Sequence, residues 1–197
     1  MFNGDKRILA KLAPKLERVL IGDPHAASAY LLSDIMKSMG AKRCVVAQSE
    51  NRTAEMLAEL NPQLIFLEIH GPDFDGAGLI TKLRRGRPPC RAAPVIVVSG
   101  DAREPTIRLA QNAGAHEFLA KPFTAASVAK RVENVLLKSR PWIELEVYVG
   151  PCRRRFNSGA ATASRRRGDA ASEAEGGPPA SAEAATPQTA AIVAPAP

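Results

Sequence analysis

Short apolar runs alternate with amphipathic stretches between residues 18 and 138. The unbroken apolar run Leu64–Leu67 is typical of a strand buried on both faces of a parallel sheet. In other stretches, such as 26–39, apolar residues recur at the three- and four-residue spacing of a helix with one buried face. The predicted strands are 18–22, 44–47, 64–67, 94–99 and 117–120, and the predicted helices are 26–39, 51–60 capped by Asn51, 75–85, 102–113 and one that begins after Thr124. Five strands alternating with five helices predict an α/β fold with a doubly wound, five-stranded parallel sheet.

The character of the chain changes on both sides of this region. Residues 1–17 mix Lys, Arg and apolar residues, and we expect a poorly defined leader in which Pro14 interrupts any helix over 8–16. Residues 139–156 are predicted to be an extended segment that contains Trp, Tyr and Arg. Residues 157–197 hold mostly small and polar side chains, whose burial would not repay the entropy of ordering, and they are predicted to be disordered. We expect no DNA-binding domain after the last helix.

Composition narrows the class of protein only slightly. The chain has 197 residues, a net charge of +7 and a pI of about 9.7, which favours an anionic partner without choosing one. No apolar run of membrane-spanning length and no secretion signal is visible, and the cysteines Cys44, Cys90 and Cys152 have neither disulfide nor metal spacing. A cytoplasmic protein is therefore expected. The histidines His25, His70 and His116 also lack metal spacing, and His70 is expected to lie in a solvated loop.

Four polar or charged side chains that could form a site lie at or after the ends of four of the predicted strands. They are Asp23, Glu68, Ser99 and Lys121. Because the carboxyl ends of parallel strands meet at one edge of an open α/β sheet, where ligand sites form, we expect these groups to line one crevice.

The order and spacing of these residues resemble the receiver domain of two-component response regulators, which has the CheY-like, flavodoxin-like fold. The resemblance covers about residues 18–138. It implies a phosphoacceptor turn at Glu68, a small hydroxyl residue at Ser99, a switch aromatic at Phe118 and the family's lysine after the fifth strand at Lys121. The supporting motifs are Pro72 and Asp75-Gly76 after Glu68, and Lys121-Pro122-Phe123 after the fifth strand.

Two departures from the family pattern change the expected chemistry. The family has Asp at the acceptor position, where this chain has Glu68, and it has two adjacent acids where this chain has Asp23-Pro24. The extra methylene of Glu moves its oxygens by more than ~1 Å, and a misplacement of that size can cost on the order of 10²-fold. Mg²⁺ demands near-ideal octahedral geometry, and Pro24 removes one of the carboxylates that would bind it. We therefore expect no enzyme and no efficient phosphorylation.

Two interpretations of Glu68 stay open. In the first, it is a built-in surrogate for the phosphorylated state that reaches Lys121 and Ser99 and biases Phe118 inward. In the second, it pairs with Lys121 in an inert pocket that only holds the loops together. Residual Mg²⁺ binding by Asp23 and Glu68 is a further open alternative.

The C-terminal segment offers a second candidate site at Tyr148, Arg153, Arg154, Arg155 and Phe156. It resembles the arginine-rich extension of alphaproteobacterial CheY-like effectors of cyclic di-GMP, which act on the flagellar motor or on adhesion machinery. Guanidinium groups bind phosphates bidentately and stack on purines, and aromatic rings add stacking. The alternatives are a solvated charge patch and unspecific binding of RNA or another polyanion.

The function predicted from the sequence is that of a stand-alone, receiver-like signalling protein that binds a protein partner. The resemblance places the partner on the face of the fourth family helix, the fifth strand and the last helix, with the residues Arg103, Arg108, Phe118, Thr124 and Lys130. The competing hypotheses are a conventional receiver that is phosphorylated by a histidine kinase, and a nucleic-acid-binding accessory protein that acts through its basic tail.

Overall fold

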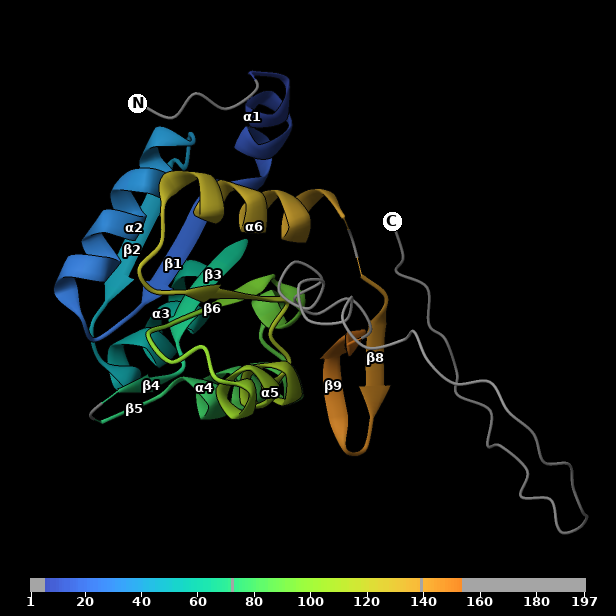
Figure 1. Cartoon of the computed structure of the whole chain (residues 1–197). Coiled ribbons are helices and arrows are strands. Elements are labelled where there is room, and N and C mark those ends of the chain that lie inside the picture. The colour runs from blue at the N-terminus through green and yellow to red at the C-terminus, as the bar shows by residue number, and fades with distance from the viewer. Residues whose placement is uncertain (1–5, 72, 139, 154–197) are drawn as a thin grey trace, which may run out of the picture. The chain divides into compact units, whose positions relative to one another are not determined.

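The computed structural model describes residues 6–71, 73–138 and 140–153. Its centre is a five-stranded sheet (Figure 1). The strands are β1 (Arg18–Gly22), β2 (Arg43–Ala47), β3 (Leu64–Glu68), β6 (Val95–Ser99) and β7 (Glu117–Ala120). Their order is β2-β1-β3-β6-β7 and every neighbouring pair is parallel, so that Phe66 lies between Ile21 and Ile96. The predicted doubly wound parallel sheet is confirmed.

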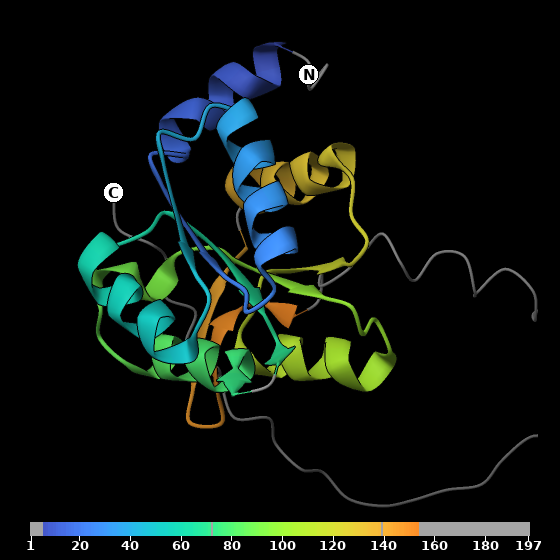
Figure 2. The ribbon, with the colours of Figure 1, turned by 90° about the vertical axis from the view of Figure 1, so that its left-hand side faces the viewer.

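Helices cover both faces of the sheet (Figure 2). On one face lie α2 (Ala26–Ser38) and α6 (Ala125–Leu137), and on the other lie α3 (Glu50–Leu60), α4 (Gly76–Arg85) and α5 (Glu104–Ala113). Successive side chains of a strand point to opposite faces, and β3 accordingly sends Leu64 and Phe66 into one apolar cluster and Ile65 and Leu67 into the other. This explains the unbroken apolar run, because both faces of β3 are buried.

The helix starts follow from local side-chain chemistry. Asp75 caps α4 by accepting a hydrogen bond from the Gly78 N–H (2.8 Å), and Thr124 caps α6 in a reciprocal pair with Ser127. The prediction that Asn51 caps α3 was wrong: Ser49 is the cap, and its hydroxyl accepts from the Arg52 N–H at 3.3 Å.

The N-terminal segment is better ordered than the sequence suggested. It contains α1 (Lys6–Leu12) and a 3₁₀ turn, η1 (Ala13–Lys15), and the side chains of Leu12 and Leu16 are buried in the apolar cluster under α2 and α6. Pro14 lies in the first turn of η1, where its missing N–H removes no helical hydrogen bond. Instead of the poorly defined leader that we expected, the described part of this segment forms a helix that packs on the core.

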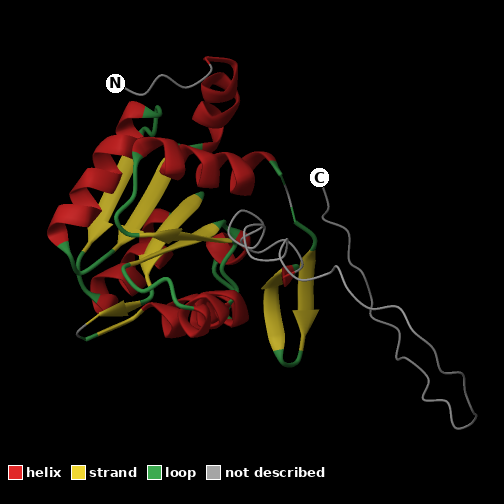
Figure 3. Ribbon diagram, in the orientation of Figure 1, coloured by secondary structure: helices red, strands yellow, loops and turns green. Residues whose placement is uncertain are grey.

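The segment after α6 forms an antiparallel hairpin (Figure 3). Its strands are β8 (Trp142–Leu145) and β9 (Tyr148–Pro151), and β9 packs against α4 and α5. Tyr148 is buried, and its hydroxyl donates to the Pro151 carbonyl at 2.6 Å. Gly150 has a positive φ and lies so close to Gly114 that a Cβ would come within 3.0 Å of its Cα. The packed part of the chain thus extends beyond residue 138, where we expected the domain to end.

Arg84 on α4 joins this hairpin to the rest of the fold. Its side chain is fully buried, and its guanidinium donates to the carbonyls of Gly114 (3.0 Å), Ala93 (3.0 Å) and Arg91. The same group lies 5.4 Å from the ring centre of Trp142. Burial lowers the pKa of Arg84 to about 10, which leaves it charged at neutral pH. A buried arginine is tolerated here because its donors meet backbone acceptors.

His116 lies beside Arg84 and gives the fold a pH dependence. Its Nδ1 accepts from the Val95 N–H (3.2 Å) and lies 3.3 Å from Arg84 Nη2. Burial, together with the positive charges of Arg84 and Arg140, lowers the pKa of His116 well below its usual value. Below pH ~6.5 the histidine therefore binds a proton in the unfolded chain but stays neutral in the native state. Each further pH unit of acidification then lowers the free energy of unfolding by up to ~1.4 kcal/mol.

We expect the unfolding free energy to fall between pH 6.5 and 5, with a shallower fall for His116→Asn. Asn keeps an acceptor near the Nδ1 position but does not titrate. Urea unfolding at several pH values measures both slopes. Equal slopes for the two proteins would contradict the buried neutral imidazole.

Candidate functional site

The carboxyl edge of the sheet brings the predicted polar residues together. Asp23 follows β1, Glu68 and Ser99 are the last residues of β3 and β6, and Lys121 follows β7. Asp23, Glu68 and Ser99 are each less than 5% exposed, so the crevice is largely closed to solvent.

Glu68 lies directly against the start of α4, in a tight turn that requires glycine at position 76. After β3 the chain forms a two-residue ladder between β4 (His70–Gly71) and β5 (Phe74–Asp75) and then enters α4 at Gly76. A Cβ at Gly76 would lie 1.9 Å from the backbone carbonyl oxygen of Glu68. The Asp75-Gly76 pair therefore both caps α4 and lets it begin directly against the end of β3.

Lys121 bridges the two acids of the crevice. Its Nζ donates to Asp23 Oδ2 at 2.7 Å and to Glu68 Oε2 at 2.8 Å. Burial alone would lower the pKa of Lys121, but the hydrogen bonds and the charges of the two carboxylates outweigh it and raise that pKa. The ammonium therefore stays charged between the two carboxylates.

The remaining carboxylate oxygens are also engaged by donors of the chain itself. Asp23 Oδ1 accepts from the His25 N–H at 2.8 Å, and Asp23 Oδ2 accepts from the Ser28 hydroxyl at 2.6 Å as well as from Lys121. Glu68 Oε1 accepts from the Ile69 N–H at 2.8 Å. Each oxygen of the two buried carboxylates thus accepts at least one internal hydrogen bond.

His25 is a member of the site that sequence reasoning missed. Its Nδ1 lies 3.3 Å from Asp23 Oδ1. One potential metal-ligand atom from each of Asp23, His25 and Glu68 lies within 4.8 Å of the other two. The only sequence signal was its position two residues after Asp23. His25 itself is exposed, whereas both acids are buried.

This donor set does not fit the Mg²⁺ that the resemblance implies. Mg²⁺ prefers oxygen ligands at near-octahedral geometry, whereas the third donor here is an imidazole nitrogen and Pro24 supplies no carboxylate. The Lys121 ammonium lies between the two acids and uses one oxygen of each. A magnesium ion between the two acids would compete with this ammonium for their oxygens.

Ser99 acts on its own loop instead of on Glu68. Its hydroxyl accepts from the Asp101 N–H at 3.2 Å, and no hydrogen bond among the described residues joins it to Glu68, so the predicted reach of Glu68 to Ser99 is not found. Asp101 in turn accepts two bonds from the Arg103 guanidinium, both 2.8 Å, and one from Thr106 (2.7 Å). These bonds, led by Arg103, lower the pKa of Asp101 and tie the loop to the start of α5.

Phe118 points into the core. It is 3% exposed and belongs to the apolar cluster under α3, α4 and α5. The prediction that Phe118 forms part of the partner surface was therefore wrong. The other predicted members of that surface are exposed, namely Arg103, Arg108, Thr124 and Lys130.

The candidate nucleotide site at the C-terminus is only partly described. Tyr148 was predicted to stack on a base, but its ring is buried and the Arg153 guanidinium lies over it at 3.8 Å. Arg153 itself is exposed. Arg154, Arg155 and Phe156 lie outside the described residues. Within the described ranges, no helix has the length and apolar character needed to cross a bilayer.

Comparison with known proteins now decides the family. Residues 19–133 match the model of the response regulator receiver domain. The chain belongs to this family. Asp23, Glu68, Ser99 and Lys121, on whose order and spacing the resemblance rested, all lie at the carboxyl ends of the strands.

The relatives are regulators of several lengths. The chain is 31% identical to the chemotaxis protein CheY of Bacillus subtilis over 121 residues, which cover 60% of this chain and 97% of that protein. It is 28% identical to the probable chemotaxis protein CheY of Rhizobium etli, covering 60% and 91%. It is 29% identical to the sensory/regulatory protein RpfC of Xanthomonas campestris, but this match spans 62% of this chain and only 17% of RpfC.

Solved structures show the same fold. The chemotaxis protein CheY4 of Vibrio cholerae superposes with a TM-score of 0.57 at 16% identity, over 61% of this chain and 98% of that one. A CheY-like receiver domain from Methanospirillum hungatei gives a TM-score of 0.56 at 23% identity, over 62% and 95%.

Proposed function

We propose that this chain is a receiver-type signalling protein that acts by binding a protein partner and is not efficiently phosphorylated. The observation that carries the proposal is the engagement of every oxygen of Asp23 and Glu68 by internal donors, with Lys121 bridging both acids. Lys121 neutralises one of the two carboxylate charges, and internal donors satisfy both carboxylates without an added phosphoryl group.

The chemistry of phosphoryl transfer supports this proposal. The acceptor oxygen must be free and in line with the phosphorus, and a cation must neutralise the developing charge. Glu68 Oε2 accepts from the Lys121 ammonium and Oε1 accepts from the Ile69 N–H, and both hydrogen bonds lower the nucleophilicity of the carboxylate. Pro24 leaves the crevice one carboxylate short of the family pattern.

The outcome of signalling is a protein contact in two-component regulation. Relatives named as chemotaxis and sensory/regulatory proteins support this role. The inward Phe118 and the charged Lys121 bridge favour the interpretation of Glu68 as a built-in surrogate, in which the outer surface of α5, β7 and α6 is presented permanently to a histidine kinase, a motor protein or another cytoplasmic partner.

Acetyl phosphate with Mg²⁺ tests the proposal. We expect intact-mass analysis to show no added phosphoryl group on the wild-type chain. Glu68→Asp alone should react weakly because Pro24 remains, and Glu68→Asp combined with Pro24→Asp should react best. A phosphoryl group on wild-type Glu68 at the rate of the double variant would contradict the proposal.

Cyclic di-GMP binding stays a prediction from the sequence. A specific site requires Arg153–Arg155 more than Arg165–Arg167, and Lys at position 154 should fail to replace Arg because an ammonium lacks the fork and the stacking plane. Calorimetric titration of alanine variants of each cluster measures this. Equal losses for the two clusters, with competition by linear RNA, would indicate an unspecific polyanion patch instead.

A further inference from the structure

A cavity lies at the edge of the sheet opposite to Asp23 and Glu68. Its volume is about 720 Å³, and it lies where β1, β3 and β6 begin, beneath α1 and the C-terminal half of α6. The strands are five residues long, so roughly 15 Å of sheet separates it from the acidic crevice. Its size falls within the ~300–1,000 Å³ of small-molecule sites.

The charges around this cavity have one sign. Its lining includes Lys11, Lys15 and Arg18 and no Asp or Glu. Within the described residues, Lys11 and Lys15 form no ion pair, while Arg18 donates to the Asn61 carbonyl at 3.0 Å and lies 3.9 Å from Glu17. Glu17 makes its shorter contact, 3.1 Å, with Lys42. An excess of positive charge is therefore left at the cavity.

The same wall offers a neutral donor. Gln63 uses its side-chain oxygen to accept from the backbone N–H groups of Glu17 and Arg18, which fixes the orientation of the amide. Its Nε2 then has no acceptor among the described residues. A donor amide beside three cations suits an oxyanion such as a carboxylate or a phosphate.

Apart from Asn61, the remaining lining is apolar and stiff. It consists of Val135 and Leu136 of α6, Cys90 and Ala93, and the prolines Pro14, Pro62, Pro89 and Pro94. Because proline fixes its own φ, these residues hold the wall in place with little conformational entropy left to lose on binding.

We propose that this cavity binds a small amphipathic anion, with its charged head at Lys11, Lys15 and Gln63 and its apolar body against Val135, Leu136 and Ala93. The site is independent of the acidic crevice, since it shares no residue with it. A ligand here would stabilise the contact of α1 with α6, the helix that ends at this cavity and also borders the predicted partner surface.

The test uses the full chain and three probes in calorimetric titration: decanoate, decyltrimethylammonium and inorganic phosphate. We expect decanoate to bind, and the two others to bind at least ~10-fold more weakly because each lacks either the charge or the apolar body. Binding should also weaken with salt, as expected for partly exposed charges. Equal affinity for the cationic probe would overturn the proposal, because it would indicate an unspecific apolar surface.

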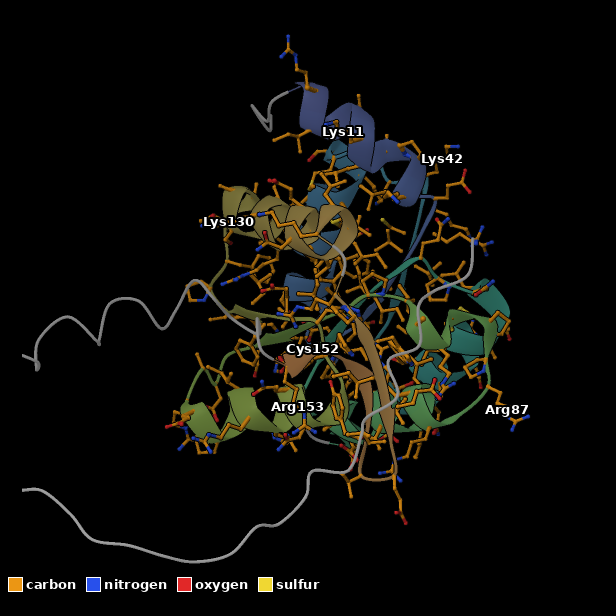
Figure 4. The ribbon with its side chains drawn as sticks, turned by 90° about the vertical axis from the view of Figure 1, so that its right-hand side faces the viewer. Lys11, Lys42, Arg87, Lys130, Cys152 and Arg153 are labelled. Atoms are coloured by element: carbon orange, nitrogen blue, oxygen red, sulfur yellow. The ribbon has the colours of Figure 1, made fainter. Side chains whose placement is uncertain are left out.

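Variants locate the site. The double variant Lys11→Gln with Lys15→Gln should weaken decanoate binding by about tenfold or more, because it removes two charge-assisted contacts. The matched control, Lys82→Gln with Lys130→Gln, removes the same charge from exposed lysines of α4 and α6 that do not line the cavity (Figure 4 shows Lys11 and Lys130). Ala93→Phe should fill the apolar end and abolish binding. Equal losses in the test and control pairs, or full binding by Ala93→Phe, would overturn the assignment.

Discussion

Replacing Lys121 by Met is expected to lower the free energy of unfolding by about 3–5 kcal/mol, the cost of removing one partner from a buried ion pair. Met keeps most of the side-chain volume but leaves Asp23 and Glu68, both 3% exposed, without their shared cation. Urea unfolding at pH 7 measures the loss.

Two further variants separate charge from packing. Lys130→Met, on the exposed surface of α6, should change the stability by less than ~0.5 kcal/mol. Adding Glu68→Gln to Lys121→Met should restore part of the loss, because it removes one of the two facing charges.

The stabilisation by Lys121 also depends on pH, because its pKa is raised in the folded protein. The contribution of Lys121 to stability is fully present below its pKa in the unfolded chain, near ~10.4, and is lost as the pH rises through its pKa in the folded protein. A loss below ~1 kcal/mol for Lys121→Met would show that the acids are solvated.

Ending the chain after Lys138 is expected to cost at least ~3 kcal/mol relative to ending it after Phe156. The shorter chain loses Tyr148, which is 5% exposed, and exposes Arg84 and the adjoining parts of α4 and α5. Tyr148→Ala alone should cost about 3–5 kcal/mol, as for other buried aromatic side chains. Thermal and urea unfolding of the two truncated chains measure the difference.

The hairpin supplies its own control. Val147, in the turn between β8 and β9, is 81% exposed, and Val147→Ala should leave the stability within ~0.5 kcal/mol of wild type. Equal stability of the chains ending at residues 138 and 156 would mean that the hairpin only rests on the surface.

The sequence predicted the sheet well because each strand is a short apolar run that ends at a polar residue. Leu64–Glu68 is the clearest case, since its four apolar residues mark a strand buried on both faces and Glu68 marks its end. The hairpin was missed because Glu146-Val147 contains none of the Gly, Asn or Asp residues that mark a tight hairpin turn. Arg84 was missed because arginine is rarely buried, and nothing in its neighbours shows that carbonyl groups surround it.

The acidic crevice was predicted in its members and in the contact of Glu68 with Lys121, which the structure confirms, but not in its other bonds. Strand ends place Asp23, Glu68 and Lys121 at one edge of a parallel sheet, so their proximity follows from topology alone. That Lys121 also bonds to Asp23, that His25 lies beside Asp23 and that Ser99 bonds to its own loop depend on side-chain rotamers, which the spacing of residues in the sequence does not encode.

Backbone amide NMR with Mg²⁺ and beryllofluoride tests the central claim most directly. Beryllofluoride mimics a bound phosphoryl group and does not turn over, so it also reveals a receiver whose acyl phosphate hydrolyses too fast for mass analysis. We predict unchanged resonances for Ser99, Phe118 and Lys121 in the wild-type chain and shifts in the Glu68→Asp, Pro24→Asp double variant. Saturable shifts of these resonances in the wild-type chain would contradict the account, because they would show that Glu68 and Asp23 release Lys121 to a metal-bound phosphoryl group.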